Sequence, residues 1–566
     1  MKEKVIIFLN KYWFIRMLLL VFFRPKRFLF EFYYSFVDYK KFKKSIQETK
    51  LFYSQTNQDE FNKNRPGLLI VAGQMMSAQW LQIWTVLGSI KKSKGYNVYA
   101  ITSKSQPIQN LYLKLFHFNL IYIENLRIDD QIIPQNILNK FNELESFHDF
   151  KSFEIDNIPL GKMALSTYSR HKATGILDVT DSIAKDSVRN WLKKLYKTLI
   201  VSKNIFLANN IEMLYFTEVF MEEYGALYYS ALKEKLNIIR FAGTVRDDAI
   251  VVQHMNSQSD RTHFSSLSKK SWEIILNNPY STQIDYELNQ NFQDRYGSKW
   301  GLSKRNQLNT TISSLEEAKT QLNIKTDKKI AIIYSHILYD TLFFNGEDLF
   351  DNYADWLIQT VKAACNNDKV QWFIKVHPSN LWRGELESFL NGKYEEVRLI
   401  EEFVGQLPEH VKFIYPDTNL SPYTWLQLTD FGITVRGTSG IELGALGKIV
   451  ITAGSGRYED IGFSYNSVSK EDYLLKLKQI PEIESPTLYQ IELGKKFAYA
   501  TFCMKPFTLD FLKPTIRTGK TDIFNSDDLV FIFNNKFGNI IPNSISNFYE
   551  WSVKPNEIDF LKEWPY

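Results

Sequence analysis

The chain contains little cysteine: only Cys365 and Cys503 in 566 residues. Two cysteines exclude a disulfide framework and a cysteine-rich metal site, and they favour a reducing compartment such as the cytoplasm. A large excess of one charge is also missing, because 68 basic side chains stand against 63 acidic ones and leave a net charge of +5. This balance gives no indication of a nucleic-acid partner.

Long hydrophobic runs are absent from the amino-terminal region. The apolar run 17–23 has seven residues, far fewer than the roughly 20 that a membrane-spanning helix needs. No small-residue cleavage site follows it, so the run is a poor signal peptide. Residues 1–44 instead combine eleven Lys or Arg with three acids and many aromatic side chains.

A basic, aromatic, amphipathic segment suits the interface of an anionic membrane. The alternative is a helical arm that packs on its own protein. We therefore expect residues 1–60 to form a separate helical arm. We also expect a cytoplasmic protein with possible peripheral contact, through residues 1–44, at the inner face of the cell membrane.

The remainder of the chain alternates strand-like and helix-like segments. In its first half we expect strands at 67–73, 97–103, 212–218 and 237–243, with helices at 77–95 and 222–236. The stretch 244–325 is polar and less regular. In the second half we expect strands at 328–336, 370–377, 410–416, 430–437 and 448–454, with helices at 352–367, 421–430 and 439–447.

This alternation predicts an α/β fold of two doubly wound, Rossmann-like domains. We place the first domain at 61–320, the second at 321–480, and a tail that packs back on the first domain at 481–566. Sheets of this kind bind ligands at the carboxyl ends of their strands.

The segment VRGTSGIELGALGKIVITAG, residues 435–454, contains the most informative of these strand ends. Its spacing fits neither a dinucleotide fingerprint nor a P-loop. Thr438 or Ser439 is expected to cap the following helix, and Gly437 and Gly440 to allow close approach of a ligand. The first helical turn would offer N–H groups and a positive dipole to a phosphate. A tight turn without a ligand is the alternative.

Other strand ends of the same domain carry polar or glycine-rich loops. Lys375, His377 and Pro378 lie at the end of one expected strand, and His336 lies at the end of another. Arg457 lies in a third loop, 452–463. Loops at this edge are where α/β enzymes place function, so their coincidence predicts a binding site there.

These motifs resemble the donor domain of bacterial capsule-polysaccharide biosynthesis glycosyltransferases. The resemblance rests on KVHP, PDTNLSPY and VRGTSGIELGALGKIVITAGSGRYEDIGF and covers about 330–465; the match at 222–243 is weaker. It implies a GT-B architecture with a cleft between two Rossmann-like domains. Related enzymes that use CMP-activated sialic acid or Kdo also carry an HP motif and a Ser/Thr-rich loop.

The resemblance implies that His377, Thr438, Ser439 and Gly440 hold the phosphate of a nucleotide-sugar donor. Glu442 would reach the ribose or base, or brace the loop. A CMP-Kdo-like donor is favoured. Arg436 departs from the usual Ser-Thr type of loop, and its charge suits a pyrophosphate, so UDP- and GDP-sugars stay open.

The same resemblance implies a reaction that needs neither a metal nor a cofactor. Lys375, His377, Arg436, the 438–440 amides and, more weakly, Arg457 would stabilise the leaving phosphate. An inverting reaction needs a base near the acceptor hydroxyl. The candidates for that base are Glu218, Glu222, Asp247 and Asp248.

We therefore expect a glycosyltransferase that moves a sugar to a surface polysaccharide or its lipid-linked acceptor. Two alternatives remain at this point. One is a sugar-nucleotide epimerase of the same fold, which needs no acceptor. The other is a non-catalytic scaffold of a capsule assembly complex.

Overall fold

The computed structural model describes residues 62–72, 78–104, 106–126, 132–297, 299–300, 310–324, 328–380, 393–509 and 543–565. The expected arm at 1–60 and its membrane contact lie outside these residues. Among the helices in the described ranges, none is long and apolar enough to cross a membrane.

The first domain is built on a seven-stranded sheet in the order β13-β6-β5-β4-β1-β2-β3. Strands β1 to β5 run parallel to one another, and β6 is antiparallel to β5. The strands are β1 (Gly67–Val71), β2 (Asn97–Thr102), β3 (Asn119–Tyr122), β4 (Ile211–Phe216), β5 (Asn237–Gly243), β6 (Ala249–Met255) and β13 (Phe507–Thr508).

Helices cover this sheet, so strands such as β1, with sequence GLLIV, are buried along their whole length. The helices between Ala78 and Lys233 are α4 (Ala78–Ser93), α5 (Pro107–Leu115), α6 (Gln135–Asn142), α7 (Phe147–Ser152), α8 (Leu160–Lys172), α9 (Ser182–Ala208) and α10 (Glu222–Lys233).

The second domain is built on a six-stranded sheet in the order β12-β11-β10-β7-β8-β9, with every pairing parallel. Counted within the domain, this is the order 3-2-1-4-5-6 of the Rossmann fold, whose switch point falls between β7 and β10. The strands are β7 (Ile330–Tyr334), β8 (Gln371–Lys375), β9 (Val411–Ile414), β10 (Phe431–Thr434), β11 (Ile449–Thr452) and β12 (Tyr465–Asn466).

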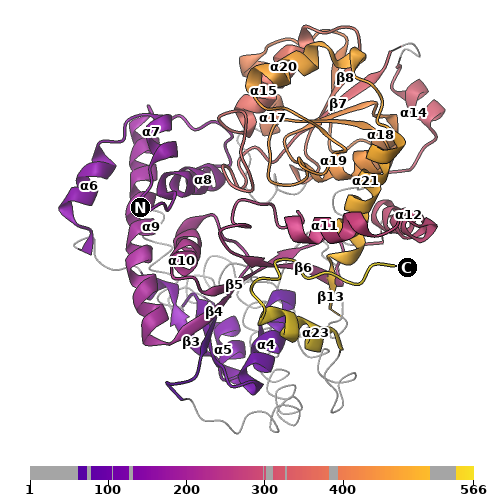
Figure 1. Ribbon diagram of the computed structural model, residues 1–566. Coiled ribbons are helices and arrows are strands. Elements are labelled where there is room, and N and C mark those ends of the chain that lie inside the picture. The colour runs from indigo at the N-terminus through magenta and orange to yellow at the C-terminus, as the bar shows by residue number, and fades with distance from the viewer. Residues whose placement is uncertain are drawn as a thin grey trace, which may run out of the picture.

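The helices of this second sheet alternate with its strands, as the sequence predicts. They are α14 (Leu315–Gln321), α15 (Tyr353–Cys365), α17 (Glu395–Phe403), α18 (Pro422–Leu428), α19 (Thr438–Ala445) and α20 (Lys470–Lys478). Figure 1 shows this domain above the first one, with α11 and α12 in the region between the two sheets. The fold is therefore the expected two-domain α/β GT-B arrangement.

The stretch 244–325 is more regular than the sequence indicates. It contains β6, α11 (Lys269–Asn277) and α12 (Thr282–Tyr296). The buried side chains of α11 and α12 share a core with β7 and α19 of the second domain, although the sequence division at 320 assigns them to the first. Because the outer faces of α11 and α12 are polar, the composition of this stretch does not predict that the two helices pack on the second domain.

The carboxy-terminal segments contact both domains. Helix α21 (Leu488–Tyr499) packs on α19 and α12 and continues into a π-helix, η5 (Ala500–Met504). The chain then adds β13 to the edge of the first sheet, and α23 (Asn543–Ser552) packs against α4. The tail thus links the two domains.

Candidate active site

A cavity of about 530 Å³ lies between the two domains, a size suited to a small-molecule ligand. One wall consists of the ends of β7, β8 and β10. The other consists of residues that follow β4 and β6, together with β5 itself. Of the residues predicted from sequence, this cavity is lined by Glu218, His336, Lys375, His377, Pro378, Arg436, Gly437, Thr438, Ser439, Glu442 and Arg457.

Four other predicted residues are not in the cavity wall: Glu222, Asp247, Asp248 and Gly440. Asp248 is held by Arg246 through two contacts of 2.8 and 2.9 Å in the turn between β5 and β6. Asp247 lies in the same turn and is 5% exposed. Three of the four candidates for the base, Glu222, Asp247 and Asp248, therefore lie away from the cavity, whereas Glu218 lines it.

Gly440 faces the interior of the protein and not the cavity. A Cβ at this position would collide with the hydroxyl of Tyr458, which donates to the Gly437 carbonyl at 3.0 Å. A Cβ at Gly437 would lie 2.7 Å from the Thr434 hydroxyl. Contacts within the chain therefore explain both glycines, whereas the sequence suggested approach of a ligand.

The HP loop that follows β8 is fixed by a buried acid on α17. Glu396 accepts from the His377 amide at 3.0 Å and from the Asn380 side chain at 2.9 and 3.0 Å. Burial raises the pKa of Glu396 to about 7. The Ser379 amide donates to Nδ1 of His377 at 3.3 Å, so the neutral ring carries its proton on Nε2.

Lys375 is the last residue of β8 and is 7% exposed. Its ammonium makes no hydrogen bond or ion pair with the described part of the chain. Desolvation lowers the pKa of Lys375 to about 8. A buried ammonium without an acid partner in the cavity wall is a candidate contact for an anionic ligand.

Helix α19 begins directly at the cavity. Its N-cap is Gly437, with no side-chain cap, whereas the sequence predicted a cap from Thr438 or Ser439. The amides of Thr438 and Ser439 have no acceptor among the described residues. They are therefore oriented, with the positive end of the helix dipole, to bind an anion.

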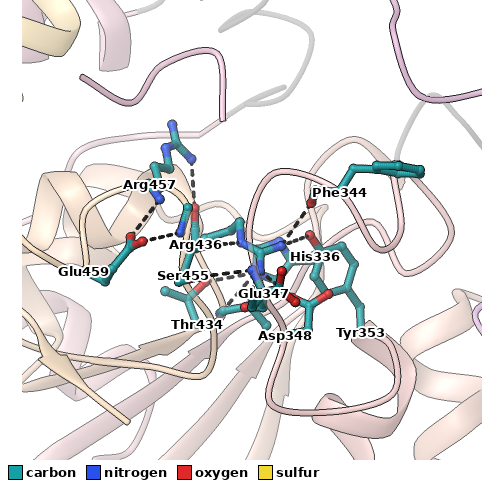
Figure 2. A network of polar contacts seen from close by, with 12 residues as sticks. His336, Phe344, Glu347, Asp348, Tyr353, Thr434, Arg436, Ser455, Arg457 and Glu459 are labelled. Atoms are coloured by element: carbon teal, nitrogen blue, oxygen red, sulfur yellow. Dashed lines mark hydrogen bonds and ion pairs between the residues drawn. The ribbon is translucent and has the colours of Figure 1, made fainter. Parts of the chain in front are cut away.

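Arg436 braces the loop between β7 and α15 (Figure 2). The guanidinium donates to the carbonyls of Ser455 (2.7 Å), Glu347 (2.9 Å) and Phe344 (3.4 Å), to the Tyr353 hydroxyl (3.1 Å), and to Asp348. All five of its N–H groups are thus engaged. The expected role of Arg436 in holding a pyrophosphate does not fit this geometry.

Arg457 is less completely satisfied. It donates to the Arg436 carbonyl at 2.9 Å, to Thr438 Oγ1 at 3.0 Å and to Ser265 Oγ at 2.7 Å, but its Nε has no partner among the described residues. Burial lowers the pKa of Arg457 to about 10. No carboxylate of the described chain pairs with it, so its charge is available to the cavity.

His336 and Glu442 also make contacts within the chain. The Val435 amide donates to Nε2 of His336 at 3.2 Å, and the ring stacks on Tyr353 at 4.6 Å between centroids. Glu442 accepts from Arg295 at 2.9 Å and from Tyr296 at 2.7 Å. The sequence left two roles open for Glu442, contact with the ribose or base and bracing of the loop. These contacts fit the bracing role.

Two residues of the opposite wall were not singled out in the sequence. Arg240 on β5 and His263 after β6 both line the cavity. Burial raises the pKa of the nearby Glu218, and the charge of Arg240 opposes that rise. No sequence motif marks these positions, because β6 and the segment that follows it were assigned to an irregular region.

The charge of the cavity wall is positive. Its basic side chains are Arg240, Arg295, Lys375, Arg436 and Arg457, and its acidic side chains are Glu218, Asp340 and Glu442. Within the described chain, no group of three or more side chains is arranged to hold a metal ion. The arrangement favours an anionic ligand.

Comparison with known proteins adds little beyond the fold. No family model matches the chain, and no curated protein matches it. One similar solved structure is the KpsC beta Kdo 2,4 transferase from Thermosulfurimonas dismutans, at 15% identity and a TM-score of 0.32, with 54% of this chain and 87% of that chain covered.

Two further structures have lower scores. The UDP-GlcNAc 2-epimerase from Neisseria meningitidis has 11% identity and a TM-score of 0.24, covering 76% of this chain and 95% of its own. A glycosyltransferase from Rickettsia africae has 10% identity and a TM-score of 0.27, covering 87% and 99%. Likenesses of this strength carry no functional argument.

Proposed function

We propose that the protein is a nucleotide-sugar-dependent glycosyltransferase. The observation that supports this most strongly is the combination of Lys375, Arg457 and the first turn of α19 at one end of the cavity. Three sources of positive potential meet there, at the switch point of a Rossmann-like sheet. Two of them lack acidic partners. The phosphate of a nucleotide sugar supplies the missing negative charge.

In this proposal the donor binds to the second domain. The ammonium of Lys375, the guanidinium of Arg457 and the amides of Thr438 and Ser439 contact the phosphate, and the Nε2–H of His377 contributes a neutral donor. These groups stabilise the charge that develops on the phosphate as the glycosidic bond breaks, which is the role of a metal in other transferases. A CMP-Kdo-like donor remains our preferred candidate.

The acceptor binds against the first domain. Glu218 is the base that fits this position, because it lines the cavity and burial raises its pKa. A carboxylate with an elevated pKa accepts a proton from a hydroxyl more readily than an ordinary one. The acceptor is a saccharide or glycolipid of a surface polysaccharide, and peripheral membrane contact through residues 1–44 would bring the enzyme to it.

Thermal unfolding of the purified protein in CMP, UDP and GDP tests the donor site. A nucleotide that binds the native state raises the melting temperature as its concentration passes Kd. We expect one nucleotide to do so, His377→Ala to reduce the shift, and Lys375→Met to abolish it. Lys412→Met serves as a control because Lys412 lies on neighbouring β9 and is not in the cavity wall.

Incubation with the matching nucleotide sugar, with and without acceptor saccharides, tests the reaction. Acceptor-dependent release of nucleotide supports transfer. Isomerisation of the sugar without acceptor, with or without release of nucleotide, would replace the proposal with an epimerase. Absence of binding by all three nucleotides would contradict the donor site.

A further inference from the structure

Arg240 is a buried guanidinium whose charge the chain leaves largely uncompensated. Its side chain is 5% exposed and lies between two aromatic rings, Phe220 at 4.9 Å and Phe264 at 5.4 Å from its Cζ atom. Its Nε and Nη1 atoms have no hydrogen-bond partner in the described part of the chain. The carboxylate of Glu218 approaches its Nη2 atom only to 4.0 Å.

Two other buried arginines of the cavity, Arg436 and Arg295, show how this chain can satisfy such a group. Arg436 has five acceptors, and Arg295 contacts Glu442 at 2.9 Å. A desolvated cation without comparable partners destabilises the folded state. Because Arg240 lines the cavity, a bound anion can supply what the chain does not.

His263 extends the same wall beside Arg240. Its ring packs on Phe264 with 4.2 Å between centroids, so the two side chains share one aromatic neighbour. The Ser265 amide donates to Nδ1 of His263 at 3.1 Å, and the Ser265 hydroxyl lies 2.7 Å from the same atom. Arg457 donates to that hydroxyl at 2.7 Å, so the hydroxyl in turn donates to His263.

These contacts fix the protonation of His263. Since Nδ1 accepts, the neutral ring carries its proton on Nε2. Burial and the nearby Arg457 lower the pKa of His263 well below its usual value. The ring therefore stays neutral near pH 7 and offers one N–H donor. The HP-loop histidine, His377, is held by its own Ser379 in the same way.

We propose that Arg240 and His263 form a second anion subsite, on the first-domain wall, that binds an acidic group of the saccharide acceptor. The group is a carboxylate or a phosphate, and the first-domain side of the cavity holds it, close to the proposed donor phosphate because His263 and Arg457 share the Ser265 hydroxyl. This inference rests on the proposed function only in taking the second substrate to be an acceptor. Compensation of Arg240 by the substrate would also make Glu218 a stronger base, because Glu218 would lose part of its electrostatic stabilisation.

Titration of the full-length protein with three simple sugars, followed by saturation-transfer NMR, tests the subsite. The probes are D-glucuronate for the carboxylate, glucose 1-phosphate for the phosphate, and glucose as the neutral reference. Each titration is made with saturating nucleotide, so that the donor site is occupied. We expect at least one anionic sugar to bind tenfold or more tightly than glucose, and the stronger one identifies the group.

Variants assign that preference to the two residues. Arg240→Gln should reduce anion binding to the level of glucose, and His263→Phe should weaken it several-fold while His263→Gln retains part of it. Arg261→Gln is the matched control, because Arg261 lies in the same segment with 70% of its side chain exposed and pairs with Glu347. It should leave binding unchanged.

Equal binding of the three sugars, or unchanged anion binding in both Arg240→Gln and His263→Phe, would overturn the subsite. If Arg240→Gln does not fold, His263→Phe alone decides the question. The outcome is separable from the donor proposal. If the protein binds a nucleotide but shows no preference for anionic sugars, only the subsite is refuted. If it binds no nucleotide, the sugar titrations are repeated without nucleotide. A preference for anionic sugars in those titrations then refutes only the donor site.

Discussion

Replacement of Lys375 by methionine should stabilise the protein and abolish nucleotide binding together. The ammonium of Lys375 is desolvated at the end of β8 and has no acid partner in the described chain. Its pKa of about 8 lies below the ordinary 10.5, so the fold disfavours the charged form. Methionine keeps most of the side-chain volume and removes the charge.

The pKa gives the size of this effect. A tenfold change in proton affinity corresponds to about 1.4 kcal/mol, so the buried charge costs roughly 3 kcal/mol at pH 7. Between pH 8 and 10.5 the unfolded chain binds the proton more strongly than the folded one, and the stability of the wild type therefore rises with pH in that window. Below pH 8 the full cost is present, and Lys375→Met removes it.

Urea unfolding and thermal melts at pH 7 and pH 10 measure this directly. At pH 7 we expect Lys375→Met to unfold at higher denaturant than the wild type, and the gap to shrink at pH 10. The nucleotide-induced shift should be lost at both pH values. Lys412→Met should keep that shift. A less stable Lys375→Met at pH 7, or one that still responds to nucleotide, would refute the reasoning.

Three further changes probe the supports of the site. Glu396→Gln should remove a pH dependence of the folding stability. Burial raises the pKa of Glu396 to about 7 in the folded state, so the wild type loses roughly 3 kcal/mol of stability as the pH rises from 4.5 to 7. Urea midpoints at the two pH values should show this loss only in the wild type. Gly440→Ala should destabilise by about 1–3 kcal/mol through overpacking, with partial recovery in a Gly440→Ala, Tyr458→Phe double variant, both measured by chemical denaturation. The rings of Phe220 and Phe344 stack across the domains at 4.6 Å and 7°, so a double-mutant cycle to leucine should give a coupling of about 1 kcal/mol; a coupling near zero would contradict a stable interdomain contact.

The fold of the second domain follows from local sequence signals. Its strands are uninterrupted apolar runs such as AIIY, and Gly447, which has a φ of 69°, ends the segment of α19 where the sequence indicates. The helix expected at 439–447 is found at Thr438–Ala445. Buried parallel strands and glycine-terminated helices depend on neighbours in the chain, and for that reason they can be recognised from sequence.

The side of the cavity formed by the first domain depends on distant contacts instead. Arg240 lies in an ordinary strand, and His263 follows β6, an apolar strand that the sequence analysis left inside the irregular stretch 244–325. Their significance arises from contacts between residues far apart in sequence: Arg240 lies near Phe264, and His263 is linked through Ser265 to Arg457. Similarly, the local sequence does not indicate that Arg436 donates hydrogen bonds to five acceptors, four between residues 344 and 353 and one at residue 455. Nor does it indicate that Lys375 has no acceptor among the described residues.

The distribution of partners separates groups that support the cavity from groups that face a ligand. Arg436, Glu442 and Glu396 are buried with their hydrogen bonds satisfied, and each ties a cavity loop to a helix or a neighbouring loop. Lys375, Arg457 and Arg240 are equally buried but incompletely satisfied, at a cost that a folded chain retains only where binding repays it. These three occur on both walls of one cavity, which argues for two anionic groups bound together, one on each domain. An acidic group of the acceptor would supply the counter-charge that Arg240 lacks. The anion subsite and the donor site are therefore best tested on the same protein.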